Sequence, residues 1–330
     1  MEQFKPEEVV VERGSEESSI CRNIRRALPD VPFRIVETGH LSNGRAPVEG
    51  NGFGAAKRKL YVAKHKGEFF KKCPGSEGQV CCNYFVINFA SNCPMDCSYC
   101  YLQDYLADNA ELKVFSNVDD LIAEADRTLS KHRGVFFRVG TGEITDSLAL
   151  EPYTGMVREL VPYFAAQPNV LLELKTKSDC VDSLLDLDSK GRVVVAWSMN
   201  PQRVIDADEH GTAMLNERLS AARRCQEAGY RLGFHFDPMI EYPGWEADYQ
   251  AMIEQTFATI DALALSQDSA LDRRTGALPR WQATLLSTVA RRHVPQNDRL
   301  DSSRRTDGEN LPVHGNPGSL GAGIWLCSGL

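Results

Sequence analysis

Residues 84–103 have the sequence YFVINFASNCPMDCSYCYLQ, in which an apolar run leads into three closely spaced cysteines. The run 84–90 is rich in aromatic and β-branched residues, which predicts a buried β-strand. The thiols that follow it have the spacing C-x3-C-x2-C and belong to Cys93, Cys97 and Cys100. Pro94 favours an extended backbone at the preceding cysteine, so we expect the chain to leave the strand and wrap around whatever the thiols bind.

Strand and helix patterns alternate along the chain around this stretch. Further strands are predicted over residues 135–139, 170–174, 192–199 and 231–236. Helices are predicted over residues 117–132, 151–166, 180–187, 213–228 and 247–263. Near-continuous apolar strands alternating with helices are typical of a parallel sheet covered by helices. We therefore predict an α/β fold of five β/α units, curled as a partial or full TIM-like barrel with reactive residues at the carboxyl ends of its strands.

The two ends of the chain do not share this pattern. Residues 1–75 are charge-rich and interrupted by glycine and proline, so we predict an irregular N-terminal segment before a core at 76–264. Residues 265–330 are rich in Arg, Ser and Gly and have little periodicity. Two interpretations of this tail stay open, a disordered segment and an end produced by a disrupted reading frame.

Composition excludes several classes of protein. The 330 residues are 42% hydrophobic and 25% charged, as in ordinary globular proteins, and the formal charge of −8 argues against coating nucleic acid by bulk electrostatics. The sequence contains no apolar run of signal-peptide or membrane-spanning length, so we expect a cytoplasmic protein without a membrane partner. In a reducing compartment, ten cysteines favour ligands or thiols over disulfides.

Three thiols on one tight loop are the informative feature of the cysteine pattern. Thiolates hold a 4Fe–4S cluster at its iron corners, and three of them leave one iron free to bind something other than protein. The alternative is zinc, with Cys97 and Cys100 as one half-site and Cys81, Cys82 or Cys73 completing it. Adjacent Cys81 and Cys82 make a poor second half-site, which favours the iron–sulfur cluster.

The motif CPMDCSYCYLQ resembles the cluster loop of radical S-adenosylmethionine (SAM) enzymes, and more narrowly that of the spore photoproduct lyase family of DNA repair enzymes. The similarity extends over roughly residues 82–262 and includes, in order, GTGEITDS, KTKSDCVDSLLD, WSMNP, EHGT and AGYRLGFHFDPMIEYPGW. It implies a partial β/α barrel of the radical SAM type, a 4Fe–4S cluster, and SAM chelated to the unique iron. It also implies a 5'-deoxyadenosyl radical, a damaged DNA base as substrate, and a reducing electron donor such as flavodoxin or ferredoxin.

The resemblance also implies which residues contact SAM. The glycine-rich SAM motif matches Gly140, Thr141, Gly142 and Glu143, where small residues admit a ligand and a carboxylate accepts from an ammonium group. Lys177 matches the family lysine near the SAM carboxylate, and Ser198 and Asn200 match polar contacts on the fourth strand. Without the cysteine loop, a plain strand-to-helix turn and solvated strand ends explain the same residues.

Tyr99 and Tyr101 match tyrosines that the family uses for radical transfer close to the substrate, although packing in the core is an alternative for both. The family cysteine that returns a hydrogen atom to the substrate is absent between Val135 and Ser147. Cys180 is a conceivable substitute, and a buried inert thiol is its other interpretation.

The segment Lys57 to Lys72, KRKLYVAKHKGEFFKK, combines seven Lys or Arg with interleaved aromatics, as a DNA-binding surface requires. The alternative is a solvated basic face whose aromatics pack inward. Together these features predict a radical SAM enzyme that abstracts hydrogen from a damaged DNA base. Two other functions stay open: a radical SAM enzyme with a non-DNA substrate, and a zinc-stabilised binding protein without redox chemistry.

Overall fold

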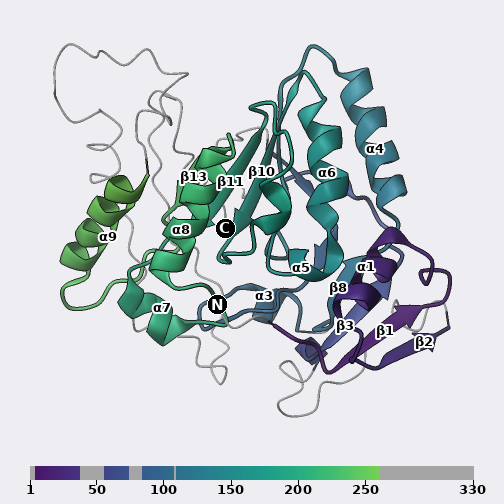
Figure 1. Ribbon diagram of the computed structural model, residues 1–330, viewed down its shortest axis with the longest axis horizontal. Helices are drawn as coiled ribbons and strands as arrows, with labels where there is room; N and C mark the ends of the chain where they lie inside the picture. Colours follow the sequence, from purple (N-terminus) through teal and green to yellow (C-terminus); the bar gives the residue numbers. More distant parts are fainter. Residues whose placement is uncertain (1–3, 38–55, 74–83, 108, 261–330) are drawn as a thin grey trace, which may run out of the picture.

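The protein was analysed as a computed structural model, which describes residues 4–37, 56–73, 84–107 and 109–260. These residues form a six-stranded sheet, a five-stranded sheet and a two-stranded ribbon (Figure 1). The chain passes from the first sheet to the second immediately before the three cysteines, so the cysteine loop starts where the two sheets meet.

The six-stranded sheet is the predicted barrel core. Its strands lie in the order β13-β11-β10-β9-β5-β4. The five parallel strands are β5 (Tyr84–Ile87), β9 (Phe137–Gly140), β10 (Val170–Thr176), β11 (Val193–Ser198) and β13 (Arg231–His235). The edge strand β4 (Phe70–Lys72) pairs antiparallel with β5. All six residues of β11 are buried, as expected for a parallel strand covered on both faces. The structure confirms the α/β fold, the five parallel strands and the partial barrel.

Three of the described helices pack against this sheet: α4 (Val118–Lys131), α6 (Met156–Ala165) and α8 (Leu215–Glu227). The other helices after β5 include α5 (Glu151–Thr154), α7 (Gln202–Asp208) and α9 (Trp245–Thr259), of which α9 packs against α8. The predicted helix 180–187 is only a short 3-10 turn at Asp182–Leu184. Figure 1 shows α6 beside β10 and α8 beside β11 and β13, and these pairs are in contact. The predicted helix 151–166 is divided at Gly155, whose left-handed backbone (φ 63°) ends α5 and starts α6.

Three strands of the second sheet lie within residues 1–75, where the sequence predicted an irregular segment, and two lie within the predicted core 76–264. Its order is β2-β1-β3-β8-β6, built from β1 (Glu8–Glu12), β2 (Phe33–Val36), β3 (Lys59–Ala63), β6 (Ala90–Ser91) and β8 (Leu112–Phe115). Helix α1 (Ser19–Ala27) connects β1 to β2 and packs against α5. The N-terminal segment is therefore more regular than predicted, because strands of four or five residues bury their apolar side chains only once they pair. The predicted tail 265–330 lies outside the described residues.

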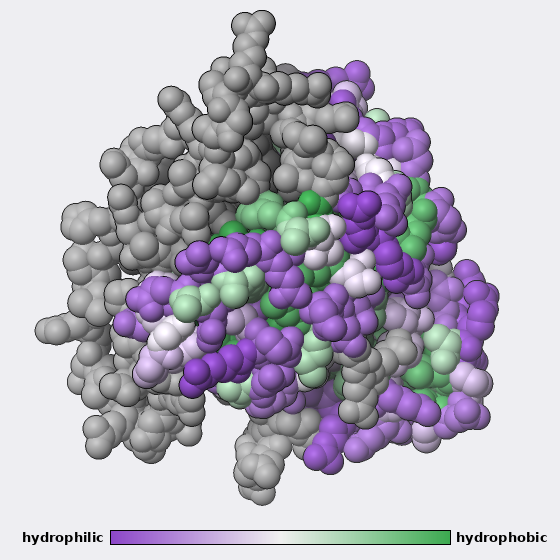
Figure 2. Space-filling view, turned by 60° about the vertical axis from the view of Figure 1, so that its left-hand side comes forward, coloured by the Kyte–Doolittle hydropathy of each residue, from purple (hydrophilic) through white to green (hydrophobic). Residues whose placement is uncertain are grey.

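The described surface is largely hydrophilic. Figure 2, turned to bring the α9 side forward, shows hydrophilic residues over most of the described surface, with apolar residues in small patches between them. Among the described residues, no helix combines the length and apolar character that crossing a membrane needs.

Candidate active site

The cysteine loop, residues 92–101, lies over the carboxyl ends of β9, β10 and β11. The Tyr101 hydroxyl donates to the backbone oxygen of Glu143, which follows β9. The Lys177 ammonium, which follows β10, stands 5.7 Å from the centre of the Tyr99 ring. The amide of Asn200, which follows β11, donates to the Tyr99 hydroxyl over 3.4 Å. The loop is therefore placed at the end of the barrel where parallel β/α folds carry their chemistry.

The three cysteines form one cluster of side chains. Cys93, Cys97 and Cys100 pack together with Met95 and Ala149, and each has a free thiol. Burial raises the pKa of the Cys93 thiol well above its usual range and that of Cys97 to about 12. Thiols with such a raised pKa stay protonated at neutral pH, and they lose their protons when they bind a metal.

Zinc and an iron–sulfur cluster require different arrangements of their thiolate ligands. Zinc requires its ligands to converge within about 2.3 Å of one ion. Within the described ranges, no group of three or more His, Cys, Asp or Glu side chains converges closely enough to hold a single metal ion. A cube instead takes each thiolate on a separate iron corner, which spreads the sulfurs apart. Cys81 and Cys82, the remaining candidates for a zinc site, lie outside the described residues.

Residues from distant parts of the chain hold the cysteine loop. Asn92 adopts the left-handed conformation (φ 69°), and its side chain donates to the oxygen of Ala110 over 2.6 Å. The backbone of β7 (Asp96–Cys97) pairs with β12 (Glu209–His210), and the Ser98 hydroxyl donates to Asp208 over 2.6 Å. The loop is thereby pinned on both sides of Cys97.

A buried polar network lies beneath Tyr99. The Tyr99 hydroxyl donates to Glu209, and Glu209 forms an ion pair of 2.5 Å with Arg218, with both of these charged side chains 0% exposed. Arg218 also donates to the backbone oxygens of Ala213 and Ser198, each over 2.8 Å. Burial alone would raise the pKa of the Glu209 carboxyl, but Arg218 and then Lys177 lower it overall. The pair supports Tyr99 and the loop from below.

Sequence reasoning did not assign roles to Glu209 and Arg218. Glu209 belongs to EHGT, one of the motifs that carry the family resemblance, and this was the available signal. Arg218 lies near the start of α8, and arginine on a helix is usually exposed, so its burial becomes visible only in three dimensions.

The connection between β9 and α6, residues 141–155, is held by side chains of its own and by the adjacent end of β10. The Thr141 hydroxyl donates to Ser147 over 2.7 Å. The buried Asp146 carboxylate accepts from the Thr176 hydroxyl and from the backbone nitrogen of Lys177, each over 2.7 Å. Asp146 thereby fixes the backbone from which Lys177 extends toward the cysteine loop.

The two glycines of the predicted SAM motif have different surroundings. A Cβ at Gly140 would lie 1.8 Å from the Tyr84 hydroxyl oxygen, so this glycine makes room for a tyrosine of β5. That hydroxyl donates to Glu173 over 2.5 Å. A Cβ at Gly142 would lie 3.2 Å from the Lys175 side chain, which is tight but less severe. The role predicted for Gly140, close approach to a ligand, therefore becomes close approach to Tyr84.

Two polar side chains predicted to contact SAM have contrasting partners. Glu143 has a side-chain oxygen buried without a hydrogen bond, 3.5 Å from the Lys71 ammonium. An ammonium group in the barrel mouth is the ligand that this carboxylate suits. Asn200 is buried and joined to Glu209 over 2.8 Å and to Tyr249 over 2.5 Å. It lies at the predicted site but is already part of the network beneath Tyr99.

Ser198 and Lys177 complete the predicted set. Ser198 ends β11 and is buried, and its backbone oxygen is an acceptor for Arg218. Burial by itself would lower the pKa of Lys177, but the negative charges of Glu209, Cys97 and Asp146 together outweigh it, and the pKa is raised. Lys177 therefore keeps its positive charge beside the cysteines, as binding a carboxylate requires.

The basic segment does not form the predicted stacking surface. Phe69 and Phe70 are buried in the core, which confirms the alternative that these aromatics pack inward. Lys57 is also buried and reaches the cysteine loop. Lys71 approaches Glu143 at the barrel mouth, and Lys72 beside it is exposed.

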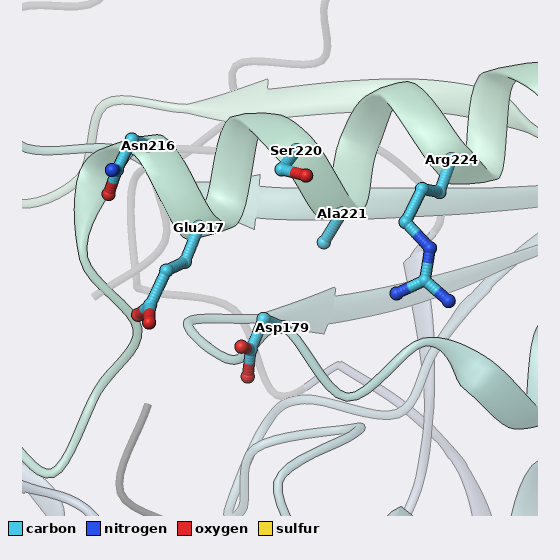
Figure 3. A pocket seen from close by; sticks show the side chains of 6 residues that line it. All are labelled: Asp179, Asn216, Glu217, Ser220, Ala221 and Arg224. Carbon is cyan, nitrogen blue, oxygen red and sulfur yellow. The ribbon is translucent and has the colours of Figure 1, made fainter.

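The described hollow of about 320 Å³ lies away from these residues. It is lined by five residues of α8 together with Asp179, which follows β10 (Figure 3). Arg224 on its rim is paired with Asp182. None of the predicted site residues lines this hollow, so it is not the candidate active site. Cys180, next to Asp179, has a pKa raised to about 12, chiefly by burial, and no described contact joins it to the tyrosines.

A partial β/α barrel with a C-x3-C-x2-C loop over its strand ends, an adjacent lysine and a buried carboxylate defines the radical SAM class of enzymes. The family model of spore photoproduct lyase matches residues 4–271. The chain therefore belongs to the spore photoproduct lyase family.

Curated relatives agree with this assignment. The chain is 28% identical to spore photoproduct lyase of Bacillus subtilis over 269 residues, 80% of this chain and 75% of that protein. It is 25% identical to the Clostridium acetobutylicum enzyme over 249 residues, covering 75% and 72%. A third match, to the Geobacillus enzyme, is 30% identical over 182 residues, 55% of this chain and about half (53%) of that relative.

Solved structures show the same fold. A spore photoproduct lyase variant with bound AdoMet and dinucleoside spore photoproduct superposes with a TM-score of 0.70 at 25% identity, covering 79% of this chain and 76% of that one. The enzyme complexed with dinucleoside spore photoproduct gives 0.69 at 25% identity over the same shares.

Proposed function

We propose that this protein cleaves SAM reductively at a 4Fe–4S cluster and uses the resulting radical to repair a thymine-derived lesion in DNA. The observation that carries the proposal is the cluster of three free thiols on one loop, placed over the strand ends beside a charged lysine. The solved relatives bind AdoMet and a dinucleoside spore photoproduct, which supports both the cofactor and the substrate.

Cys93, Cys97 and Cys100 would hold the cluster, and its remaining iron would be open to SAM. When bound, the reduced cluster and SAM supply a 5'-deoxyadenosyl radical. The protein supplies position and a dry environment: Cys97 is buried, and Tyr99 is supported by Glu209 from below.

The charged groups at the mouth match the two charges of the methionyl part of SAM. Lys177 would bind the carboxylate, and the Glu143 oxygen that lacks a hydrogen bond would bind the ammonium group beside Lys71. Gly142 has no side chain, so SAM could come close to the backbone of the connection at this residue. Ser198 and Asn200 lie at the carboxyl end of β11.

Tyr101 is the phenol that a substrate can reach, since its side chain is 41% exposed and its hydroxyl lies at the start of the connection. We assign it the donation of a hydrogen atom to a carbon radical of the substrate, which forms a C–H bond and leaves a phenoxyl radical. A reducing donor of the flavodoxin or ferredoxin type returns an electron and a proton to the phenoxyl. Tyr99 is partly buried and hydrogen-bonded to Glu209, as an inner relay would be.

The test is anaerobic reconstitution with iron and sulfide, then incubation with dithionite, SAM and a dinucleoside spore photoproduct. We expect 5'-deoxyadenosine to form and the photoproduct to be converted to its thymine form. Cys97→Ala serves as the control and is expected to lose both the chromophore and SAM cleavage. A wild-type protein that takes up iron but leaves SAM intact would overturn the proposal.

The second candidate is a radical SAM enzyme with a substrate other than DNA. It is favoured by the lack of a cysteine between Val135 and Ser147, where Glu143 occupies the loop after β9. In the same assay, SAM cleavage that leaves the photoproduct intact would select this function.

A further inference from the structure

We propose that Lys57 is a positioning residue for the cysteine loop and that its charge raises the reduction potential of the cluster held there. The proposal rests on the proposed function, because it requires a cluster on Cys93, Cys97 and Cys100. Lys57 belongs to the segment that leads into the N-terminal sheet, outside the barrel, and the family motifs do not include it.

The contacts of Lys57 place its ammonium inside the cysteine loop. Its Nζ donates to the backbone oxygen of Met95 and to Oδ1 of Asp96, each over 2.5 Å. Met95 and Asp96 are two of the three residues between Cys93 and Cys97. A single side chain thus fixes the turn that separates two of the thiols.

Burial makes this charge effective. The Lys57 side chain is 6% exposed, whereas that of its partner Asp96 is 61% exposed. Solvent screens the charge of the exposed carboxylate far more than that of the buried ammonium. The two charges therefore do not cancel at the cysteine thiols, and the positive charge of Lys57 dominates there.

A positive charge beside an iron–sulfur cluster stabilises the reduced form, which carries one more electron. Removing the charge of Lys57 therefore lowers the potential. Removing the charge of Asp96 raises it, by less, because that carboxylate is screened. A residue that only supported the loop mechanically would not give shifts of opposite sign at the two positions.

The experiment is an EPR-monitored redox titration of the full-length, reconstituted protein, with iron content measured on each sample. The variants are Lys57→Met, Lys57→Arg and Asp96→Asn. Lys59→Met is the matched control, since this nearby lysine pairs with Glu8 over 2.8 Å and is 40% exposed.

For Lys57→Met we expect the ratio of reduced to oxidised cluster at a fixed potential to fall about tenfold, which is a shift of about 59 mV for a one-electron couple. Asp96→Asn should shift the curve the opposite way, while Lys57→Arg and Lys59→Met should stay near the wild type. If Lys57→Met does not hold iron, the other two variants test the proposal. It then requires a higher potential in Asp96→Asn and a potential near that of the wild type in Lys57→Arg.

Iron-loaded Lys57→Met with the wild-type potential, or an Asp96→Asn shift in the same direction as Lys57→Met, would overturn the proposal. Both results leave the proposed function standing, because the wild type still holds its cluster. A wild type that takes up no iron would instead overturn the proposed function together with this inference.

Discussion

The cysteine loop and the connection 141–155 both lie at the carboxyl end of the barrel, but they are held in different ways. The loop depends on residues far along the chain, among them Lys57, Asp208 and the Glu209–Arg218 pair. The connection is held next to β9 by its own side chains and by the end of β10, through Asp146 above all. Its α5 part also packs against α1, where Asn23 donates to the Thr154 oxygen. Substitution of the remote residues that hold the cysteine loop should therefore reduce its ability to bind the cluster. Substitutions within the connection should change the stability of the fold and leave the thiols in place.

The largest effect is expected from Arg218→Met, which tests the remote support of the loop. The substitution leaves the Glu209 carboxylate buried without its ion pair, and such a loss costs about 3–5 kcal/mol of unfolding free energy. We expect urea unfolding to show this loss and iron content after reconstitution to fall with it. Arg223→Met, which removes an exposed pair with Glu227, should change stability by less than about 0.5 kcal/mol. Full iron content in a destabilised Arg218→Met variant would show that the cysteine loop does not depend on this remote pair.

The second effect concerns the connection and depends on pH. Burial raises the pKa of Glu151 to about 7, and one of its oxygens lacks a hydrogen bond among the described residues. The folded protein holds this proton more tightly than the unfolded chain, whose carboxyl titrates near 4.5. This contribution to stability is therefore complete below about pH 4.5 and is lost as the pH rises to about 7.

Glutamine does not ionise, so Glu151→Gln removes the loss of unfolding free energy that accompanies ionisation of Glu151. This loss amounts to about 3 kcal/mol at most. We expect the variant to gain stability over the wild type between pH 5 and pH 8 in denaturant unfolding, with unchanged iron content. An identical pH dependence in the two proteins would show that Glu151 is not the titrating group.

An intermediate effect is expected at Gly140→Ala, where β9 meets the connection. The added methyl group meets the Tyr84 ring and hydroxyl, so the tyrosine must move and its hydrogen bond to Glu173 is strained. We expect a loss of about 1–3 kcal/mol in thermal or chemical unfolding. Gly134→Ala is the control, because a Cβ there meets nothing within 4 Å. Equal stability of the two variants would argue against the crowding at Gly140.

The smallest effect on stability is expected for Tyr101→Phe, which links the two regions. Its exposed hydroxyl donates to the Glu143 backbone, and its loss should change unfolding free energy by about 0.5 kcal/mol or less. The variant should bind iron and SAM normally and lose photoproduct conversion, as measured by product chromatography. Wild-type turnover would remove Tyr101 as the hydrogen donor.

The sequence predicts the barrel well and its surroundings poorly, for physical reasons. The runs at β10 and β11 are long and apolar enough to be recognised without knowing their neighbours. Strand β1 has only five residues between charged positions, so its pairing partners determine whether it forms.

Side chains follow the same rule. The cysteine spacing is local, and the thiols were found from it. The segment that contains Lys57 was interpreted as a DNA-binding surface or a solvated basic face, and both interpretations expose the lysine. Its burial depends on a loop about forty residues away. The roles of Glu209 and Arg218 could not be predicted from the sequence, because their ion pair forms only when α8 packs beneath the cysteine loop.

Mössbauer spectroscopy of the protein reconstituted with ⁵⁷Fe, recorded with and without SAM, tests the central claim most directly. Three thiolates on one loop should hold a cluster in which one iron of four differs from the rest, and SAM should change the signal of that iron only. A protein that takes up no iron, or whose four irons are indifferent to SAM, would contradict the account.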